Sequence, residues 1–137
     1  MSAPITTQAH VGRIQSMLEN EAVSFSSDAG WMTLKGHVDT HRRLLEQTHG
    51  IEVTWDDALY SWYGNVFLPV YQVASGSGFR AAFPGKPVGD LYLALSDHFH
   101  YLRERDPAVY AADAGRSFVK HYGTGLSRYF SRFLLSY

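Results

Sequence analysis

Apolar side chains recur along most of this chain at the i, i+3, i+4 spacing of amphipathic helices. Capping residues, glycines and prolines divide this pattern into segments. No stretch alternates apolar and polar residues in the way that a half-buried strand does. The sequence therefore predicts an all-α protein, a compact bundle of about five helices. These helices are expected at about residues 7–20, 29–49, 54–74, 87–105 and 106–122.

The third expected helix is the one with the most aromatic residues. Thr54 and Asp57 have nearly the spacing of a capping box, in which two side chains satisfy backbone N–H groups at the start of a helix. Pro69 lies inside the apolar pattern, where it removes one backbone donor and crowds the carbonyl group of Asn65. We therefore expect a central helix that is kinked at Pro69.

A Pro-Gly turn separates the third and fourth expected helices. Phe83, Pro84 and Gly85 form this turn, and Asp90 follows in the first turn of the next helix. A carboxylate at that position interacts favourably with the helix macrodipole and caps free amides. These residues are interpreted as structural, because together with Pro69 they determine how the two helices meet.

Composition narrows the class of protein. The chain has 137 residues, of which 45% are hydrophobic, so one folded domain with a real core is expected. Residues 1–28 are expected to form a less tightly packed helix and linker of that domain. The chain has no cysteine, which excludes disulfides, thiolate nucleophiles and cysteine-based zinc sites. Because neither a signal-peptide core nor a membrane-spanning apolar run is found, we expect a cytoplasmic protein.

Charge is unevenly distributed along the chain, although the net charge is only −1. All thirteen acidic residues precede residue 114, whereas four cations and no acid follow it. A basic C-terminal helix is typical of a surface that meets nucleic acid, an anionic membrane surface or an acidic partner. The alternative, which we favour, is that these cations stabilise helix C-termini and cover an acidic molecule. The candidate anion-binding residues are Arg116, Lys120, Arg128 and Arg132.

Several short motifs occur together between residues 36 and 105. They are His41-Arg42, Asp57-Ala58, Trp62-Tyr63 with Pro69, Phe83-Pro84-Gly85, Asp90-Leu91-Tyr92-Leu93 and Asp97-His98. In this combination the chain resembles a family of bacterial all-helical domains of unknown function, often found C-terminal to kinase-like or ParB-like modules. Pro87-Val88-Gly89 departs from the family, whose members usually have an acidic residue and an alanine there. The resemblance implies a compact helical module and implies no reaction.

Histidines are the main candidates for metal chemistry. His37 and His41 are four residues apart on one expected helix, and Asp97 and His98 lie on another. Imidazoles on one face, completed by a carboxylate and an imidazole from a facing helix, would form a shell for a divalent metal such as zinc, iron or manganese. The alternative is that His41 and His98 are partly buried, hydrogen-bonded side chains at helix packing points. We favour this alternative and expect no cofactor.

Acid–base catalysis is a further hypothesis. Asp90, Asp97 and His98, with a tyrosine nearby, would supply a general base and an orienting group. Helix capping, however, accounts for Asp90 without catalysis. The serines of the expected helices also lack the sequence context of a nucleophile elbow. A non-catalytic protein is therefore favoured over an enzyme.

The chain is rich in aromatic residues, with nine Tyr, eight Phe and three Trp. On the third expected helix they cover more than half of the circumference, which exceeds what one buried stripe needs. Either that helix is central to the bundle, or one side of it pairs with another subunit or lines a ligand pocket. We expect a binding or assembly module, most simply a homo-oligomer. The candidate interface residues are Tyr60, Trp62, Tyr63, Phe67, Tyr71, Tyr129, Phe130 and Phe133.

Overall fold

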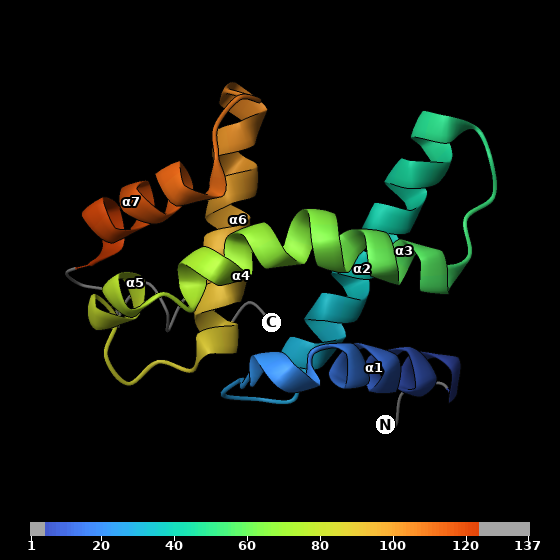
Figure 1. Ribbon diagram of the computed structural model, residues 1–137, viewed down its shortest axis with the longest axis horizontal. Coiled ribbons are helices and arrows are strands. Elements are labelled where there is room, and N and C mark those ends of the chain that lie inside the picture. The colour runs from blue at the N-terminus through green and yellow to red at the C-terminus, as the bar shows by residue number, and fades with distance from the viewer. Residues whose placement is uncertain (1–4, 124–137) are drawn as a thin grey trace. The chain divides into compact units, whose positions relative to one another are not determined.

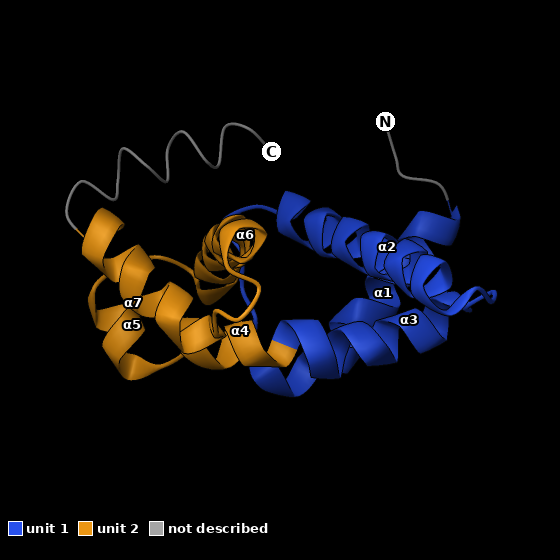
Figure 2. Ribbon diagram, turned by 90° about the horizontal axis from the view of Figure 1, so that it is seen from above, with its two compact units in different colours: residues 1–67 blue, residues 68–137 orange. Residues whose placement is uncertain are grey.

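The computed structural model describes residues 5–123, and over that range every regular element is a helix (Figure 1). This confirms the predicted all-α class. None of the helices in this range is long and apolar enough to cross a membrane. The chain divides into two compact units, residues 1–67 and residues 68–137, which are coloured separately in Figure 2. The expectation of a single domain stays a prediction.

Unit 1 consists of three α-helices and two short helical segments. These are α1 (Ile5–Met17), a 3-10 turn η1 (Glu19–Glu21), α2 (Ala29–His49), α3 (Trp55–Trp62) and a π-helical segment η2 (Tyr63–Phe67). Both α1 and α3 pack on α2. The core combines aliphatic and aromatic side chains, and its fully buried members include Ile14, Leu18, Leu34, Val38, Ala58, Trp62 and Phe67.

Two predicted helix ends of unit 1 are confirmed. Gly50 follows α2 in the left-handed conformation with φ of 67°, and its N–H donates to the carbonyl of Glu46. Thr54 caps α3, because its side-chain oxygen accepts a hydrogen bond of 3.1 Å from the backbone N–H of Asp57. Capping residues of this kind interact with backbone groups three or four residues away, so the sequence alone is enough to locate these helix ends.

Pro69 is preceded by a widened helical turn. The π-helical segment Tyr63–Phe67 ends two residues before it, and α4 (Leu68–Ala74) begins one residue before it. Widening this turn relieves the crowding between the proline ring and the carbonyl of Asn65 that a regular α-turn would impose. The sequence indicated a disturbance at Pro69, but its form as a π-helical segment was not foreseen.

Unit 2 contains α4, α5 (Ser77–Ala81), α6 (Val88–Arg105) and α7 (Ala111–Tyr122). Both α4 and α7 pack on α6. The first eight residues of α6, from Val88 to Leu95, are all buried. Asp90 lies among them in the first turn of α6, as predicted, and it is only 2% exposed.

An aromatic cluster fills the other part of unit 2. Phe118 is fully buried, and its ring centroid lies 5.3 Å from that of Phe83 and 4.9 Å from that of Tyr122. Phe79 lies 4.9 Å from Phe83 and 5.8 Å from Phe118. Phe83, from the predicted Pro-Gly turn, is therefore a core residue as well as a turn residue.

Two predicted boundaries of unit 2 are wrong. Between the third and fourth expected helices, where the sequence predicted no helix, Ser77–Ala81 form the short helix α5. The last helix was expected to begin at Asp106, but Asp106 closes α6, and its carboxylate accepts a hydrogen bond from the N–H of Ala108. The start of α7 lies at Ala111, after Tyr110, whose backbone N–H donates to the carboxylate of Asp113. An Asp-Pro pair therefore marks a turn here, because aspartate caps turns as well as helices.

Candidate functional site

In unit 1, a histidine is held to a serine across two helices. His41 on α2 places its Nε2 atom 2.8 Å from the Oγ atom of Ser61 on α3. The same Ser61 oxygen accepts a hydrogen bond of 3.3 Å from the side-chain amide of Asn65 in the π-helical segment. Burial lowers the pKa of His41 below its ordinary value of 6.5. This imidazole is thus neutral near pH 7 and serves as a hydrogen-bonded packing residue.

In unit 2, the same pairing occurs between α6 and α7. The Nε2 atom of His98 lies 2.9 Å from the Oγ atom of Ser117. His121, one turn further along α7, donates from Nδ1 to the backbone carbonyl of Ser117 at 2.8 Å. Burial, and then the neighbouring His121, lower the pKa of His98 below its ordinary value. The interpretation of His41 and His98 as partly buried, hydrogen-bonded residues is confirmed.

The four proposed metal ligands are divided between the two units. His37 and His41 belong to unit 1, and Asp97 and His98 belong to unit 2. Among residues 5–123, no group of three or more His, Asp or Glu side chains is arranged to hold a metal ion. The Nε2 atoms of His41 and His98 both face serine hydroxyl groups instead. The structure thus brings together histidine and serine, which the sequence did not pair.

The Ser117–His98 pair has the composition of a nucleophile and its base, but its surroundings do not suit acyl transfer. Ser117 lies inside α7, where the backbone N–H groups are used by the helix itself. Acyl transfer needs free donors directed at the developing oxyanion. The cavity beside the pair, of about 510 Å³, is lined by both Asp97 and Arg105, with Arg105 lying 4.2 Å above the Tyr101 ring. We interpret this cluster as a polar packing site.

The predicted aromatic interface is largely internal. Trp62 and Phe67 are fully buried and Tyr71 is only 6% exposed, so these three side chains belong to the core. Tyr63 is half-buried and donates its hydroxyl hydrogen to Glu21 at 2.6 Å. Of the predicted interface residues that the structure describes, Tyr60 is the exposed one, at 66% of the residue. The predicted interface residues Tyr129, Phe130 and Phe133 lie outside the described residues, as do Arg128 and Arg132.

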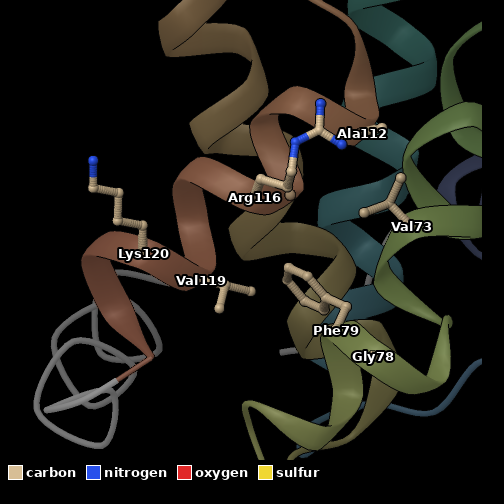
Figure 3. Close-up of a pocket in the computed structure, with 8 residues that line it drawn as sticks. Val73, Gly78, Phe79, Ala112, Arg116, Val119 and Lys120 are labelled. Carbon is tan, nitrogen blue, oxygen red and sulfur yellow. The ribbon is translucent and has the colours of Figure 1, made fainter.

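An apolar groove lies on the surface of unit 2 (Figure 3). Its volume is about 460 Å³. Figure 3 shows Phe79 and Val119 turned toward one another from α5 and α7, with Val73 of α4 beside them. We call this surface the α7 groove, and its lining residues are Val73, Gly78, Phe79, Ala112, Gly115, Arg116, Val119 and Lys120.

Two cations border the α7 groove. Arg116 forms an ion pair with Asp113 on its own helix. Lys120 is exposed, and no carboxylate of residues 5–123 pairs with it. The groove therefore offers an apolar floor with one uncompensated positive charge at its edge. Arg116 and Lys120 were predicted as anion-binding residues, but their association with an apolar groove was not.

The groove depends on a close approach between two helices. Gly115 of α7 is buried, and a Cβ atom at this position would lie 2.5 Å from the Cγ1 atom of Val73 on α4. The sequence does carry a signal for this contact, because Ala111, Ala112, Ala114 and Gly115 are all small. Small residues at these positions permit close helix packing.

The formal charges of the two units are opposite. Residues 1–67 contain eight Asp and Glu and four Lys and Arg, which gives −4. Residues 68–137 contain five Asp and Glu and eight Lys and Arg, which gives +3. The sequence indicated a change in charge near residue 114. The structure shows that the change in net charge coincides with the boundary between the two units.

Comparison of the chain with protein-family models, with curated proteins and with solved structures finds no match. The resemblance to a bacterial helical family stays a prediction. The function is therefore argued from geometry and charge alone.

Proposed function

We propose that the protein is a non-catalytic assembly module in which the α7 groove of one copy binds the Tyr60 surface of a second copy. The observation that carries this proposal is the complementarity of two surfaces on one chain. The groove is apolar with a positive edge, and the Tyr60 surface is an exposed aromatic ring beside carboxylates. A single chain that carries both surfaces needs no other partner.

The Tyr60 surface has the features of an interface anchor. Tyr60 is 66% exposed on α3, and Asp56 and Asp57 lie one turn before it on the same side of the helix. Asp56 pairs with Arg13 at 2.7 Å, whereas no cation of the described residues pairs with Asp57. Tyrosine is enriched at interface hot spots because its ring buries a large apolar area while its hydroxyl stays hydrated.

The α7 groove supplies the matching chemistry. Phe79, Val73 and Val119 would cover a tyrosine ring, and Lys120 would face the Asp57 carboxylate at the edge. Such a rim pair chiefly orients the partners and speeds association, while the buried ring supplies most of the affinity. The opposite charges of the units, −4 and +3, favour the same orientation at long range.

Because the two surfaces differ, the contact is head-to-tail. Such contacts build closed rings or open chains rather than simple two-fold dimers. An open chain would keep one unused groove at one end and one unused Tyr60 surface at the other. The oligomer should therefore grow with protein concentration and shrink as salt screens the charges.

The test is the mass in solution by sedimentation of the wild type and of charge variants. Lys120→Glu and Asp57→Lys should each reduce the oligomer to a monomer, since each creates a like-charge contact. The double variant Lys120→Glu with Asp57→Lys should restore association, because the two charges are exchanged. Glu52→Lys alters an exposed acid elsewhere in unit 1 by the same charge and should leave the oligomer unchanged.

Mixing two defective variants gives a further check. Lys120→Glu retains a working Tyr60 surface, and Tyr60→Ala retains a working groove. Their mixture should form a one-to-one dimer and no larger species. A monomeric wild type, or an oligomer that survives both Tyr60→Ala and Lys120→Glu, would overturn the proposal.

A further inference from the structure

The α7 groove has the size and the lining of a small-molecule site. Its volume of about 460 Å³ lies within the range of about 300–1,000 Å³ that is common for ligand pockets. The lining is mostly apolar, with Val73 and Val119 half-buried and Ala112 exposed. The lining residues come from α4, α5 and α7, so the walls of the groove are helices and not loops.

One charged group of the groove is left without a partner. Arg116 is already paired with Asp113 on its own helix. Lys120 is exposed, and no carboxylate of residues 5–123 pairs with it. The lining itself contains no acidic residue. A ligand with one negative charge would therefore neutralise Lys120, whereas a second negative charge would meet an arginine that is already engaged.

The walls of the groove are held in place by close packing. A Cβ atom at Gly115 would lie 2.5 Å from the Cγ1 atom of Val73, so α7 and α4 are in close contact. Phe79 is only 7% exposed, and its ring centroid lies 4.9 Å from that of Phe83 and 5.8 Å from that of Phe118. A preformed groove favours a rigid ring over a flexible chain, because the ring loses little conformational freedom on binding.

We propose that the α7 groove also binds a free aromatic monocarboxylate, which competes there with the Tyr60 surface of a second copy. The competition rests on the self-association proposed above, whereas the binding requires only the groove. The ring would lie over Val73 and Val119, and the carboxylate would face Lys120. The oligomer would therefore dissociate as the concentration of this ligand rises.

Binding is tested on Tyr60→Ala, a full-length variant that keeps the groove but lacks the competing ring. Titration of the isotopically labelled protein with 3-(4-hydroxyphenyl)propionate is followed by NMR at constant ionic strength. The amide signals of Val73, Gly78, Val119 and Lys120 should shift and saturate, with a dissociation constant on the order of 1 mM for a ligand of about twelve non-hydrogen atoms. Tyramine has the same phenol ring with a positive charge, and it should bind about tenfold more weakly.

Three further substitutions, each added to Tyr60→Ala, locate the ligand. Lys120→Gln should weaken binding of the carboxylate about threefold, because it removes one exposed charge, and should reduce the preference over tyramine. Ala112→Phe adds a ring to the lining from an exposed helix position, so it should abolish binding without changing the circular dichroism. Arg43→Gln removes an exposed arginine of α2 and should leave binding unchanged.

Sedimentation of the wild type with the same ligand separates the binding site from the proposed assembly. An oligomer that dissociates as the groove saturates supports both, and one that persists with a saturated groove would overturn the competition. A wild type that is monomeric without ligand would overturn the assembly and the competition, while saturable binding in Tyr60→Ala would still support the site. Shifts that do not saturate, equal binding of tyramine, or binding that survives Ala112→Phe would overturn the site itself.

Discussion

The two units of this protein hold a histidine in the same way but are stabilised by different means. His41 is hydrogen-bonded to Ser61 across α2 and α3, and His98 is hydrogen-bonded to Ser117 across α6 and α7. Around His98 the neighbours are rings, with Phe118 at 5.7 Å and Tyr122 at 5.8 Å between centroids. The histidine–serine hydrogen bond therefore occurs in both units, and in unit 2 the histidine is surrounded by aromatic rings.

Unit 1 is connected by directional polar contacts. The indole N–H of Trp55 donates to the carboxylate of Asp39 at 3.0 Å, and Lys35 pairs with the same carboxylate at 2.7 Å. The Trp55 ring also stacks on His10 of α1, with 3.8 Å between centroids and an angle of 2° between planes. Such links define which helix faces meet. In unit 2 the main contacts are the rings packed around Phe118 and the close approach of α4 and α7 at Gly115.

The largest expected effect comes from removing the centre of the aromatic cluster. Phe118→Ala should destabilise unit 2 by about 3–5 kcal/mol, because it removes a fully buried ring and leaves a cavity. Leu44→Ala on α2 is the matched control, since Leu44 is 55% exposed and its loss should cost under about 0.5 kcal/mol. Urea unfolding followed by far-ultraviolet circular dichroism measures both changes.

Tryptophan fluorescence sharpens the comparison, because Trp31, Trp55 and Trp62 all lie in unit 1. In Phe118→Ala the transition seen by circular dichroism should move to lower urea, while the fluorescence midpoint stays near that of the wild type. Midpoints that move together by equal amounts would show that the units unfold as one. In that case the predicted single domain would hold, and the contrast between the units would not extend to their stability.

A smaller effect is expected from Gly115→Ala. The new methyl group would lie 2.5 Å from Val73, so α4 and α7 must separate, at a cost of about 1–3 kcal/mol. Gly12→Ala in α1 is the opposite case, because a Cβ there has no neighbour within 4 Å. Removing a glycine from an open helix position should stabilise unit 1 by about 0.5–1 kcal/mol.

Thermal unfolding of these two glycine variants measures the sign of each change. Opposite signs would confirm that α4 and α7 are in close contact while α1 is open at Gly12. Stabilisation in both variants would mean that Gly115 is not a packing contact and that the α7 groove is looser than its geometry indicates.

The sequence predicted those features that act within one turn of chain. Gly50 and Thr54 specify helix ends through their own backbone or side-chain geometry, and both were placed correctly. Asp106 carries an equally clear local signal, yet it closes one helix instead of opening the next. The difference lies in the residues beyond it, because tertiary packing selects among local options of similar energy.

The candidate sites were harder to predict, because each is built by residues from several elements. The sequence identified Tyr60, Arg116 and Lys120, but it could not separate exposed Tyr60 from buried Trp62 on the same helix. Amphipathic spacing shows which side chains share a face, and it does not show which face a second helix covers. The groove likewise requires Val73, Phe79 and Val119 to meet from three helices.

The smallest expected effect is a difference in how the units respond to acid. Burial lowers the pKa of His41 in unit 1 and of His98 in unit 2, and burial followed by nearby Lys35 lowers the pKa of His10 in unit 1. A histidine whose pKa is lower in the folded state is protonated first in the unfolded state as the pH falls below 6.5. Acid therefore favours unfolding over this range, and stability returns as the pH rises toward 7.

Unit 1 should lose more stability than unit 2 between pH 7 and pH 5.5, because two such histidines lie in it against one. Each proton contributes at most about 1.4 kcal/mol per pH unit, and partial exposure of these rings reduces that value. The fluorescence midpoint in urea should thus fall more steeply with acid than the dichroism midpoint does. His41→Gln keeps a donor for Ser61 and removes the titration, so it should flatten the fluorescence response alone. A response that His41→Gln leaves unchanged would assign the acid sensitivity to His10, where protonation must occur beside the stacked Trp55 ring.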